Sequence, residues 1–345
     1  MVISGLVVAL QANFCQVQLD LPGPGAIKRL LCIRRTRLGK TGLQVCVGDR
    51  VELDGIDWPA GRGAIAHVRP RHSLLTRPAV ANCDRVVIVA ALAEPDLDPL
   101  QLSRFLLSAE ATGQAVELVF SKADLLAPEA VLAWTHRAAG WGYRALSVSL
   151  ASGKGLVALR RQLARPGLAV LCGPSGVGKS SLLNALIPAL SLRVAAVSGK
   201  LQRGRHTTRH VELFPLGPGA LLADTPGFNR PELPADPTRL AALFPELAPA
   251  LAEGGCRYSN CLHQGDPGCR VGTDWDRFAI YRQCLQELGE SRTPSPSRQP
   301  EGKRPELRID RRRESSRRRL SQQGEAQERD RDATPTELIP PAPAG

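Results

Sequence analysis

The sequence predicts a multidomain fold in which an all-β barrel (residues 1–70) precedes an α/β domain (residues 71–235) and a small helical domain (residues 236–290). Three observations predict it: short alternating segments with Gly-rich turns come first, strands and helices then alternate, and a Cys/His cluster follows. Residues 291–345 contain Arg runs and many prolines but few apolar residues, so we expect a disordered basic tail.

The 345-residue chain has a net charge of +12 and a pI near 9.7. This balance favours a polyanionic partner, nucleic acid first and an anionic membrane surface second; the plainer interpretation is a protein with a basic tail. No run of about 18 apolar residues exists, and the apolar start lacks a positively charged flank, which argues against a membrane span and a signal peptide. We therefore expect a cytoplasmic protein with no membrane partner, and a monomer by default.

Residues 1–70 alternate apolar and polar positions and are interrupted by turns. Turn signals occur at LPGPG (21–25), LGKTG (38–42) and VGDRVEL (47–53). Many short strands with Gly-rich turns are typical of a small barrel, and an SH3-like barrel would have the same pattern.

Strands and helices alternate from residue 84 onward. DRVVIVAAL (84–92) is a continuous apolar run, typical of a strand that is buried on both faces of a parallel sheet. Further strands are expected at 115–120, 143–149 and 167–173, with helices at 100–113, 128–139, 155–164 and 179–186. This alternation predicts an α/β domain with a largely parallel sheet.

The clearest motif lies between a predicted strand and a predicted helix. GPSGVGKS (173–180) fits the pattern G-x-x-x-x-G-K-[ST], whose glycines let backbone N–H groups turn toward phosphates. Lys179 is expected to reach the β- and γ-phosphates of a nucleotide, and the Ser180 hydroxyl to bind Mg²⁺. The nucleotide-binding residues predicted here are Gly173, Pro174, Ser175, Gly176, Val177, Gly178, Lys179, Ser180 and Ser181.

A second motif that can bind the metal ion, Asp-Thr-Pro-Gly (224–227), begins at the last residue of the apolar segment ALLAD (220–224). We expect Asp224 to lie at the Mg²⁺ through a water, and the Gly227 amide to meet the γ-phosphate. By itself the motif is also an ordinary turn, since Asp, Pro and Gly are turn residues. Its distance after the phosphate loop favours the metal-site interpretation.

Ser121, Lys122, Ala123 and Asp124 follow a buried strand and resemble the N-K-x-D guanine motif. The Asp124 carboxylate can accept hydrogen bonds from guanine N1–H and the exocyclic amine, a donor pair that adenine lacks, and the Lys122 stem would lie over the base. A loop with a solvated lysine is the alternative. Ser149, at the end of the next predicted strand, lies where GTPases hold the guanine carbonyl with a backbone N–H. Ser121 replaces a longer Asn that can bridge to the phosphate loop, so we expect reduced nucleotide affinity, and tighter GTP binding in Ser121→Asn.

RGRHTTRH (203–210) lies where a mobile switch loop is expected. A threonine hydroxyl from it would complete the Mg²⁺ shell, Thr208 first and Thr207 second; a basic surface loop is the alternative. Phe228 follows the second metal motif, and phenylalanine cannot orient the attacking water. His206 or a partner would have to orient it, although His206 could equally contact phosphate or RNA without a catalytic role.

The order of these motifs is unusual. The guanine motif precedes the phosphate loop, the switch loop and the second metal motif, whereas GTPases ordinarily end with the guanine motif. This order is a circular permutation, which domains tolerate because their termini often lie close together. We therefore predict a GTP-hydrolysing enzyme that binds GTP, GDP and Mg²⁺. Its second metal motif runs directly into residues 236–290, so that the nucleotide state could pull on them.

Cys256, Cys261, His263 and Cys269 supply three thiolates and one imidazole. Four such ligands suit one tetrahedral Zn²⁺ in a closed structural site, with no open position for catalysis. The alternative is a chance cluster of free thiols.

Together these motifs resemble those of the ribosome small-subunit-dependent GTPase A family. The likeness covers residues 1–285 and includes VGDRVEL, ANCD (81–84), GPSGVGKSSLLNAL, GRHTT, DTPGF and the spacing C-x4-C-x-H-x5-C. The resemblance implies an N-terminal OB-fold, a circularly permuted GTPase domain and a C-terminal zinc domain. It also implies a late role in maturing the small (30S) ribosomal subunit, with GTPase activity that this subunit stimulates. Our hypothesis is that the protein binds the rRNA of the subunit and leaves after hydrolysis.

Other functions stay open on the residues alone. The Arg-rich tail lies outside the likeness, and is either an RNA-contacting arm or a solvated tail of no set function. A P-loop kinase or ATPase is one rival, which a comparison of GTP and ATP binding would separate. A nucleic-acid-binding module with a decayed nucleotide site is another, which measurable turnover would exclude.

Overall fold

The computed structural model describes residues 2–11, 14–35, 43–76, 79–187, 190, 211–224 and 231–292. These residues belong to one compact unit, Met1–Thr293. The predicted residues His206, Thr207, Thr208 and Gly227, and the chain from residue 293 onward, lie outside the described residues.

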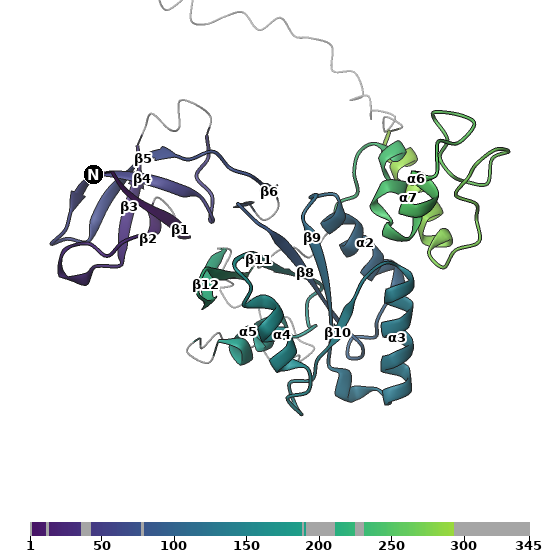
Figure 1. Ribbon diagram of the computed structural model, residues 1–345, viewed down its shortest axis with the longest axis horizontal. Helices are drawn as coiled ribbons and strands as arrows, with labels where there is room; N and C mark the ends of the chain where they lie inside the picture. Colours follow the sequence, from purple (N-terminus) through teal and green to yellow (C-terminus); the bar gives the residue numbers. More distant parts are fainter. Residues whose placement is uncertain are drawn as a thin grey trace, which may run out of the picture. The chain divides into compact units, whose positions relative to one another are not determined.

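The first five strands form a closed barrel (Figure 1). They are β1 (Ile3–Gln11), β2 (Phe14–Leu19), β3 (Arg29–Arg34), β4 (Arg50–Asp57) and β5 (Arg62–Val68). Their order is β1-β2-β3-β5-β4, with β3 and β5 parallel, and β4 pairs back with β1 to close the ring. A five-stranded barrel of this kind is the OB-fold arrangement, so the predicted N-terminal barrel is confirmed.

The hairpin of β6 (Leu74–Thr76) and β7 (Ala79–Ala81) leads from the barrel to the α/β sheet. The strands of that sheet are β8 (Arg85–Ala91), β9 (Ala115–Ser121), β10 (Ala145–Ser147), β11 (Gly167–Cys172), β12 (Glu212–Gly217) and β13 (Ala220–Asp224). Their order is β10-β9-β8-β11-β13-β12, and all neighbours are parallel except the β12–β13 hairpin. Every residue of β8 is buried, as expected for a central strand that is apolar on both faces.

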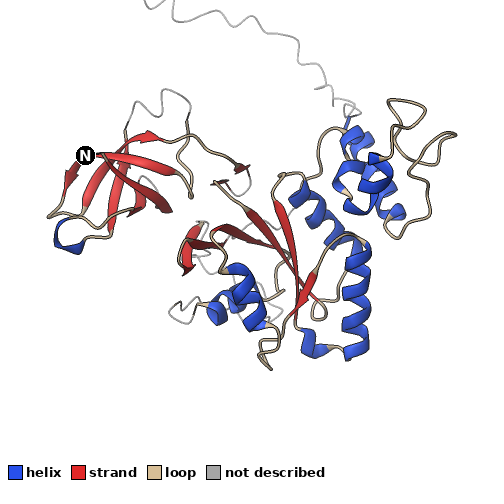
Figure 2. Cartoon of the chain, viewed as in Figure 1, coloured by secondary structure: helices blue, strands red, loops and turns tan. Residues whose placement is uncertain are grey.

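Two pairs of helices cover the two faces of this sheet (Figure 2). They are α2 (Pro99–Glu110) with α3 (Pro128–Gly140), and α4 (Leu156–Leu163) with α5 (Lys179–Leu186). α2 and α3 share a core with Val86 and Ile88 of β8, whereas α4 and α5 share a core with Val87 and Val89. Because successive side chains of a strand point to opposite faces, β8 contributes to both cores. The predicted α/β domain is therefore confirmed.

Strand β1 also belongs to two hydrophobic cores. Val7 lies in the barrel core, while Leu6 and Val8 lie in the core that contains α2 and α3. The strand pairs with β12 at Ala9 and Glu212, so that barrel and α/β sheet form one eleven-stranded sheet. This position explains the continuous apolar start of the sequence, because both faces of β1 are buried.

The C-terminal part contains short helical turns and one long helix. They are the 3₁₀ segments Pro237–Arg239, Ala241–Leu243 and Pro245–Leu247, α6 (Ala248–Ala252) and α7 (Phe278–Arg292). α7 runs past the predicted domain end at residue 290. Among the described helices, none has both the length and the apolar character that a membrane span requires.

This C-terminal part is docked on α3. The Asp276 carboxylate accepts hydrogen bonds from the Arg137 guanidinium (2.7 and 2.9 Å) and from Trp141 Nε1 (2.7 Å). The fully buried Arg277 pairs with Glu246 and lies over the Trp141 ring, 4.9 Å from its centroid. An arginine can be buried at this contact because it is both paired and stacked.

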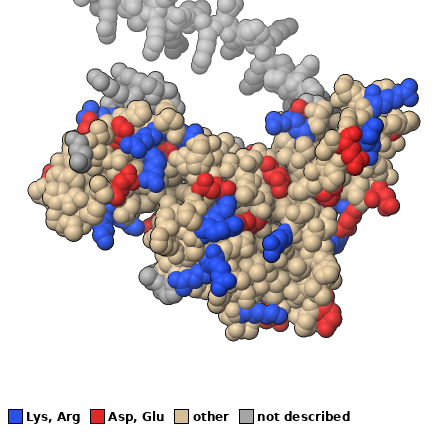
Figure 3. Space-filling view, in the orientation of Figure 1, with Lys and Arg blue, Asp and Glu red and all other residues tan. Residues whose placement is uncertain are grey.

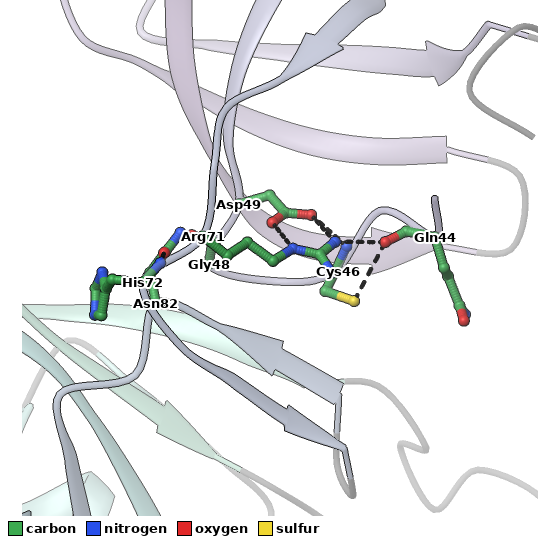
Figure 4. A network of polar contacts seen from close by, with 7 residues as sticks. All are labelled: Gln44, Cys46, Gly48, Asp49, Arg71, His72 and Asn82. Carbon is green, nitrogen blue, oxygen red and sulfur yellow. Dashed lines mark hydrogen bonds and ion pairs between the residues drawn. The ribbon is translucent and has the colours of Figure 1, made fainter. Parts of the chain in front are cut away.

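A buried polar network fixes the start of the β6–β7 hairpin to the barrel (Figure 4). The Asp49 carboxylate has no exposed surface. It accepts hydrogen bonds from Arg71 Nε (2.7 Å), Arg71 Nη2 (2.8 Å) and the Cys46 N–H (2.7 Å). Three donors therefore compensate this carboxylate for its removal from water.

Gly48 and Asn82 complete this network. The Asn82 amide donates to the Gly48 carbonyl (2.8 Å), and its oxygen accepts from the His72 N–H (3.1 Å). Gly48 has φ +90°, and a Cβ at this position would lie 2.0 Å from the Ala81 carbonyl oxygen. The motifs VGDRVEL and ANCD therefore contribute to one hydrogen-bonded network that connects the barrel to the β6–β7 hairpin.

Arg71→Met is expected to lower the free energy of unfolding by about 3 kcal/mol, because it leaves the buried Asp49 carboxylate without its ionic partner. Arg50→Met is the matched control: Arg50 and its partner Asp20 have side chains that are 53% and 35% exposed, so losing this pair should cost less than about 1 kcal/mol. Urea unfolding of both full-length variants measures the difference. Equal losses would contradict the structural importance of the Arg71–Asp49 pair.

Candidate functional site

The predicted nucleotide motifs lie at one edge of the α/β sheet. The phosphate loop follows β11, the guanine motif begins at the last residue of β9, and Asp224 ends β13. Since these strands are parallel, their carboxyl ends meet at the same edge. Segments that are far apart in the sequence are thereby brought around one site.

The phosphate loop requires glycine at defined positions. Gly173 (φ +141°) lies against β8, and a Cβ there would be 2.1 Å from the Val89 carbonyl oxygen. Gly178 (φ +89°) is the residue before α5 and also has a left-handed backbone, which glycine adopts without steric cost. The loop therefore leads directly into a helix N-terminus, where free N–H groups and the helix dipole favour an anion.

The Lys179 ammonium group lies within this loop. It donates hydrogen bonds to the carbonyl oxygens of Gly173 (2.8 Å) and Pro174 (2.6 Å). Burial lowers the pKa of Lys179, and the Asp224 carboxylate opposes this shift. The lysine predicted for the phosphates and the aspartate predicted for Mg²⁺ are thus close enough to interact electrostatically.

A pocket of about 260 Å³ lies between the guanine motif and the phosphate loop. Its lining residues are Glu94, Ser121, Lys122, Asp124, Leu125, Leu150, Ala151, Val177, Gly178, Ser181 and Leu182. Polar groups that can recognise the edge of a base are combined with apolar side chains that can cover its face. One pocket therefore contains both Asp124 and the end of the phosphate loop.

Ser121 connects the two walls of this pocket. Its side chain is buried, and its hydroxyl lies 2.6 Å from the Val177 carbonyl oxygen, to which it donates, and 3.3 Å from that of Ala90. The serine therefore makes the bridge to the phosphate loop that was expected only of a longer asparagine. This removes the reason for expecting Ser121→Asn to tighten GTP binding, because a packed site must make room for the larger side chain.

Lys122 lies along the same pocket. Its backbone is left-handed (φ +56°), and its ammonium group donates to the Glu94 carbonyl oxygen. Both residues belong to the pocket lining, so this bond holds the lysine stem at the pocket wall. Ala123 follows directly and donates its N–H to the Val148 carbonyl (3.1 Å), which attaches the guanine motif to the end of β10.

Ser149 lies in the turn beside the pocket and is buried. Its N–H donates to the Lys154 carbonyl (2.9 Å), and its hydroxyl accepts from the Ser152 N–H (3.1 Å). Because the N–H of Ser149 is engaged within the turn, Leu150 and Ala151 are better placed for a contact with the guanine carbonyl, since both line the pocket.

Five lining residues are not among the site residues predicted from the sequence: Glu94, Leu125, Leu150, Ala151 and Leu182. Leu125, Leu150 and Leu182 directly follow predicted site residues and Ala151 follows one position later, so closeness in the sequence could have identified these four. Glu94 belongs to the loop between β8 and α2, and nothing in its surrounding sequence points to the pocket.

Cys256, Cys261, His263 and Cys269 converge at a separate site. Their ligand atoms all lie within 4.8 Å of one another. His263 Nδ1 is 3.4 Å from Cys256 Sγ and 3.6 Å from Cys269 Sγ. Ligands at about 2.0–2.3 Å from a tetrahedral Zn²⁺ are about 3.6 Å from one another, which these two separations match. The cluster can therefore hold one tetrahedral metal ion.

Backbone groups and burial adjust the protonation of these ligands. The Arg270 N–H donates to Cys256 Sγ (3.5 Å) and is the main cause of the lowered pKa of Cys256. Burial lowers the pKa of His263, which favours the neutral imidazole that binds metal. Burial also raises the pKa of Cys261 to about 11, so this thiol requires the charge of a metal ion to lose its proton.

Comparison with known proteins identifies similar chains. The RsgA GTPase family model matches residues 68–234. Small ribosomal subunit biogenesis GTPase RsgA from Synechococcus sp. strain CC9605 is 58% identical over 294 residues, which cover 85% of this chain and 97% of that protein. The protein of the same name from Thermosynechococcus vestitus is 50% identical over 293 residues, covering 85% of this chain and 84% of its own length.

Two solved structures are also similar. YjeQ from Thermotoga maritima aligns with a TM-score of 0.68 at 29% identity, over 84% of this chain and 99% of its own. YloQ, described as a circularly permuted GTPase, aligns with a TM-score of 0.68 at 25% identity, over 86% of this chain and 98% of its own. The predicted likeness to a permuted GTPase is thereby confirmed.

Ser121→Ala is expected to weaken the binding of GTP and GDP about five- to tenfold, because the Val177 carbonyl loses its hydrogen-bond donor. Ser103→Ala is the matched control: Ser103 is also buried, but it lies on α2 and its hydroxyl has no hydrogen-bond partner among the described residues. Titration with a fluorescent guanine nucleotide measures both variants. Wild-type affinity in Ser121→Ala would show that the bridge does not support nucleotide binding.

Metal analysis of the purified chain is expected to find about one zinc ion per molecule, and none in Cys269→Ala, because three ligands cannot close a structural site. Cys284→Ala, which removes a buried thiol outside the cluster, should retain the metal. Chelation should lower the melting temperature of the wild type but not that of Cys269→Ala. A zinc-free wild type, or equal metal content in Cys269→Ala, would exclude the site.

Proposed function

Because the chain belongs to the RsgA GTPase family and is accordingly a GTP-hydrolysing enzyme, we propose that it acts as a late assembly factor of the small ribosomal subunit, binding rRNA and leaving on hydrolysis. The observation that supports this best is the pocket in which Asp124 and the phosphate loop lie together. The name of the relatives, small ribosomal subunit biogenesis GTPase, indicates the process.

The phosphate loop, residues 173–181, would bind the triphosphate through its backbone N–H groups and the N-terminus of α5. On nucleotide binding, the Lys179 ammonium would exchange its carbonyl partners for β- and γ-phosphate oxygens. Mg²⁺ would be held by the Ser180 hydroxyl and, through water, by Asp224, where it would neutralise charge that develops on the phosphates.

The base would enter the pocket between Lys122 and Leu150. There Asp124 would accept two hydrogen bonds from guanine, which gives the preference over adenine, and Ser121 would keep the base-binding wall in register with the phosphate loop. Leu150 or Ala151 would meet the guanine carbonyl in place of Ser149.

Residues outside the described structure would complete the hydrolytic step. Thr208 would close the Mg²⁺ shell and the Gly227 amide would meet the γ-phosphate, as the two switch motifs suggest. Since Phe228 cannot orient water, His206 or a group supplied by the small subunit would position the attacking water. In the second case turnover would depend on the subunit.

The flanking parts would provide docking. A structural Zn²⁺ in the Cys/His cluster would fix the loops between α6 and α7, and the basic OB-fold barrel would bind rRNA. We propose a monomer in the cytoplasm, where ribosomal subunits are assembled. The tail from residue 293 adds further cations to the same chain.

GTP hydrolysis is expected to rise at least tenfold when purified small ribosomal subunits are added, because the subunit would supply or order the group that positions the attacking water. ATP hydrolysis should stay at background, because adenine lacks the two donors that Asp124 recognises. Phosphate release, measured for both nucleotides with and without subunits, tests this, with large subunits as the control. Equal turnover of ATP would support a different P-loop enzyme, and GTP turnover that small subunits do not change would exclude the coupling to the ribosome.

A further inference from the structure

One segment of the chain contains no acidic residue. Residues 130–211 include twelve Lys and Arg but no Asp or Glu, so their net charge equals the +12 of all 345 residues. Within it, Arg137 and Arg165 form ion pairs and Lys179 lies in the phosphate loop. The described cations of this segment that form no ion pair with a described residue are Arg144, Lys154, Arg160 and Arg161.

Three of these cations lie together at α4. Lys154 precedes the helix, and Arg160 and Arg161 follow Val157 by three and four positions, so that they share its side of the helix. All four residues are exposed, Val157 by 76%. Figure 3 shows Lys and Arg side chains gathered over the region of α4. We call this set of four residues the α4 face.

The position of the α4 face is fixed by the opposite side of the helix. Leu159 is fully buried in the core beneath it. The Arg85 guanidinium donates to the carbonyl oxygens of Gln162 (3.1 Å) and Arg165 (2.8 Å), which satisfies the C-terminal end of α4. The Glu117 carboxylate lies beside α4, but it is only 10% exposed and is bonded to Gln162 and Arg165. It therefore does not neutralise the positive charge of the α4 face.

We propose that the α4 face binds the phosphate backbone of RNA. This inference rests on the proposed function, and it adds a contact on the GTPase domain itself to those of the flanking parts. Cations on a rigid helix that itself contains no carboxylate are complementary to a polyanion. A protein partner would require a larger apolar or aromatic centre than the single Val157.

The test compares Arg160→Ala/Arg161→Ala with the wild type in binding to purified small subunits. The full-length chain, loaded with a non-hydrolysable GTP analogue, is pelleted with subunits at several KCl concentrations. Two lost phosphate contacts should weaken binding about tenfold and reduce the slope of log affinity against log salt by about 1.5. Arg160→Lys/Arg161→Lys should bind as the wild type does, because Lys also contacts phosphate.

Arg144→Ala/Arg282→Ala is the charge-matched control, since both arginines are exposed and form no ion pair with a described residue. It should keep the wild-type salt slope. A double α4 variant that binds like the wild type would overturn the inference, as would a loss seen on subunits but not on protein-free small-subunit rRNA, which would indicate a protein partner. If the wild type itself does not bind subunits, the proposed function fails instead. Unchanged GTP turnover without subunits shows that the variant is folded.

Discussion

The parallel pairing of β8 with β11 is the constraint on which the nucleotide site depends. β11 carries the phosphate loop, while β8 pairs on its other side with β9, which carries the guanine motif. Parallel strands present their carboxyl ends at one edge, so the two motifs meet whichever comes first in the chain. The Ser121–Val177 hydrogen bond is the direct result, since it joins the end of β9 to the phosphate loop. The permutation changes the connections and leaves this geometry unchanged.

What the permutation does change is how the flanking parts are attached. The β12–β13 hairpin connects the predicted switch loop (203–210) to the second metal motif (224–227), and β12 pairs with β1 of the barrel at Ala9 and Glu212. At the other end, Asp276 and Arg277 fix the C-terminal part to α3, near Trp141. The chain after Asp224 thus runs between two anchored regions. A nucleotide-dependent movement of the second metal motif (224–227) would therefore act against the docking at α3, in addition to any direct pull on residues 236–290.

Sequence patterns predicted those features that depend on local chemistry. β8 was identifiable because a central parallel strand is apolar on both faces, and α5 because the phosphate loop requires a helix after it. Contacts between distant segments were not predictable. Glu94 lines the pocket because of the path of the β8–α2 loop, which no motif indicates. The burial of β1 on both faces could not be predicted without knowing that β1 pairs with β12. Ser121 shows the limit of motif comparison. Its short side chain can reach the Val177 carbonyl only because the phosphate loop lies close to the end of β9, and the motif does not reveal that distance.

The turn between β10 and α4 connects base recognition with the α4 face. Leu150 and Ala151 line the pocket. The Ser149 N–H donates to the Lys154 carbonyl, so Lys154, at the start of the α4 face, belongs to the same hydrogen-bonded turn as these two lining residues. Gly155 keeps this turn tight, because a Cβ there would lie 2.2 Å from the Ser147 carbonyl oxygen. An RNA phosphate held at Lys154 would restrain the wall against which guanine binds. By thermodynamic linkage, bound guanine nucleotide must then favour RNA at α4 by the same factor, so affinity for RNA and retention of nucleotide would rise and fall together.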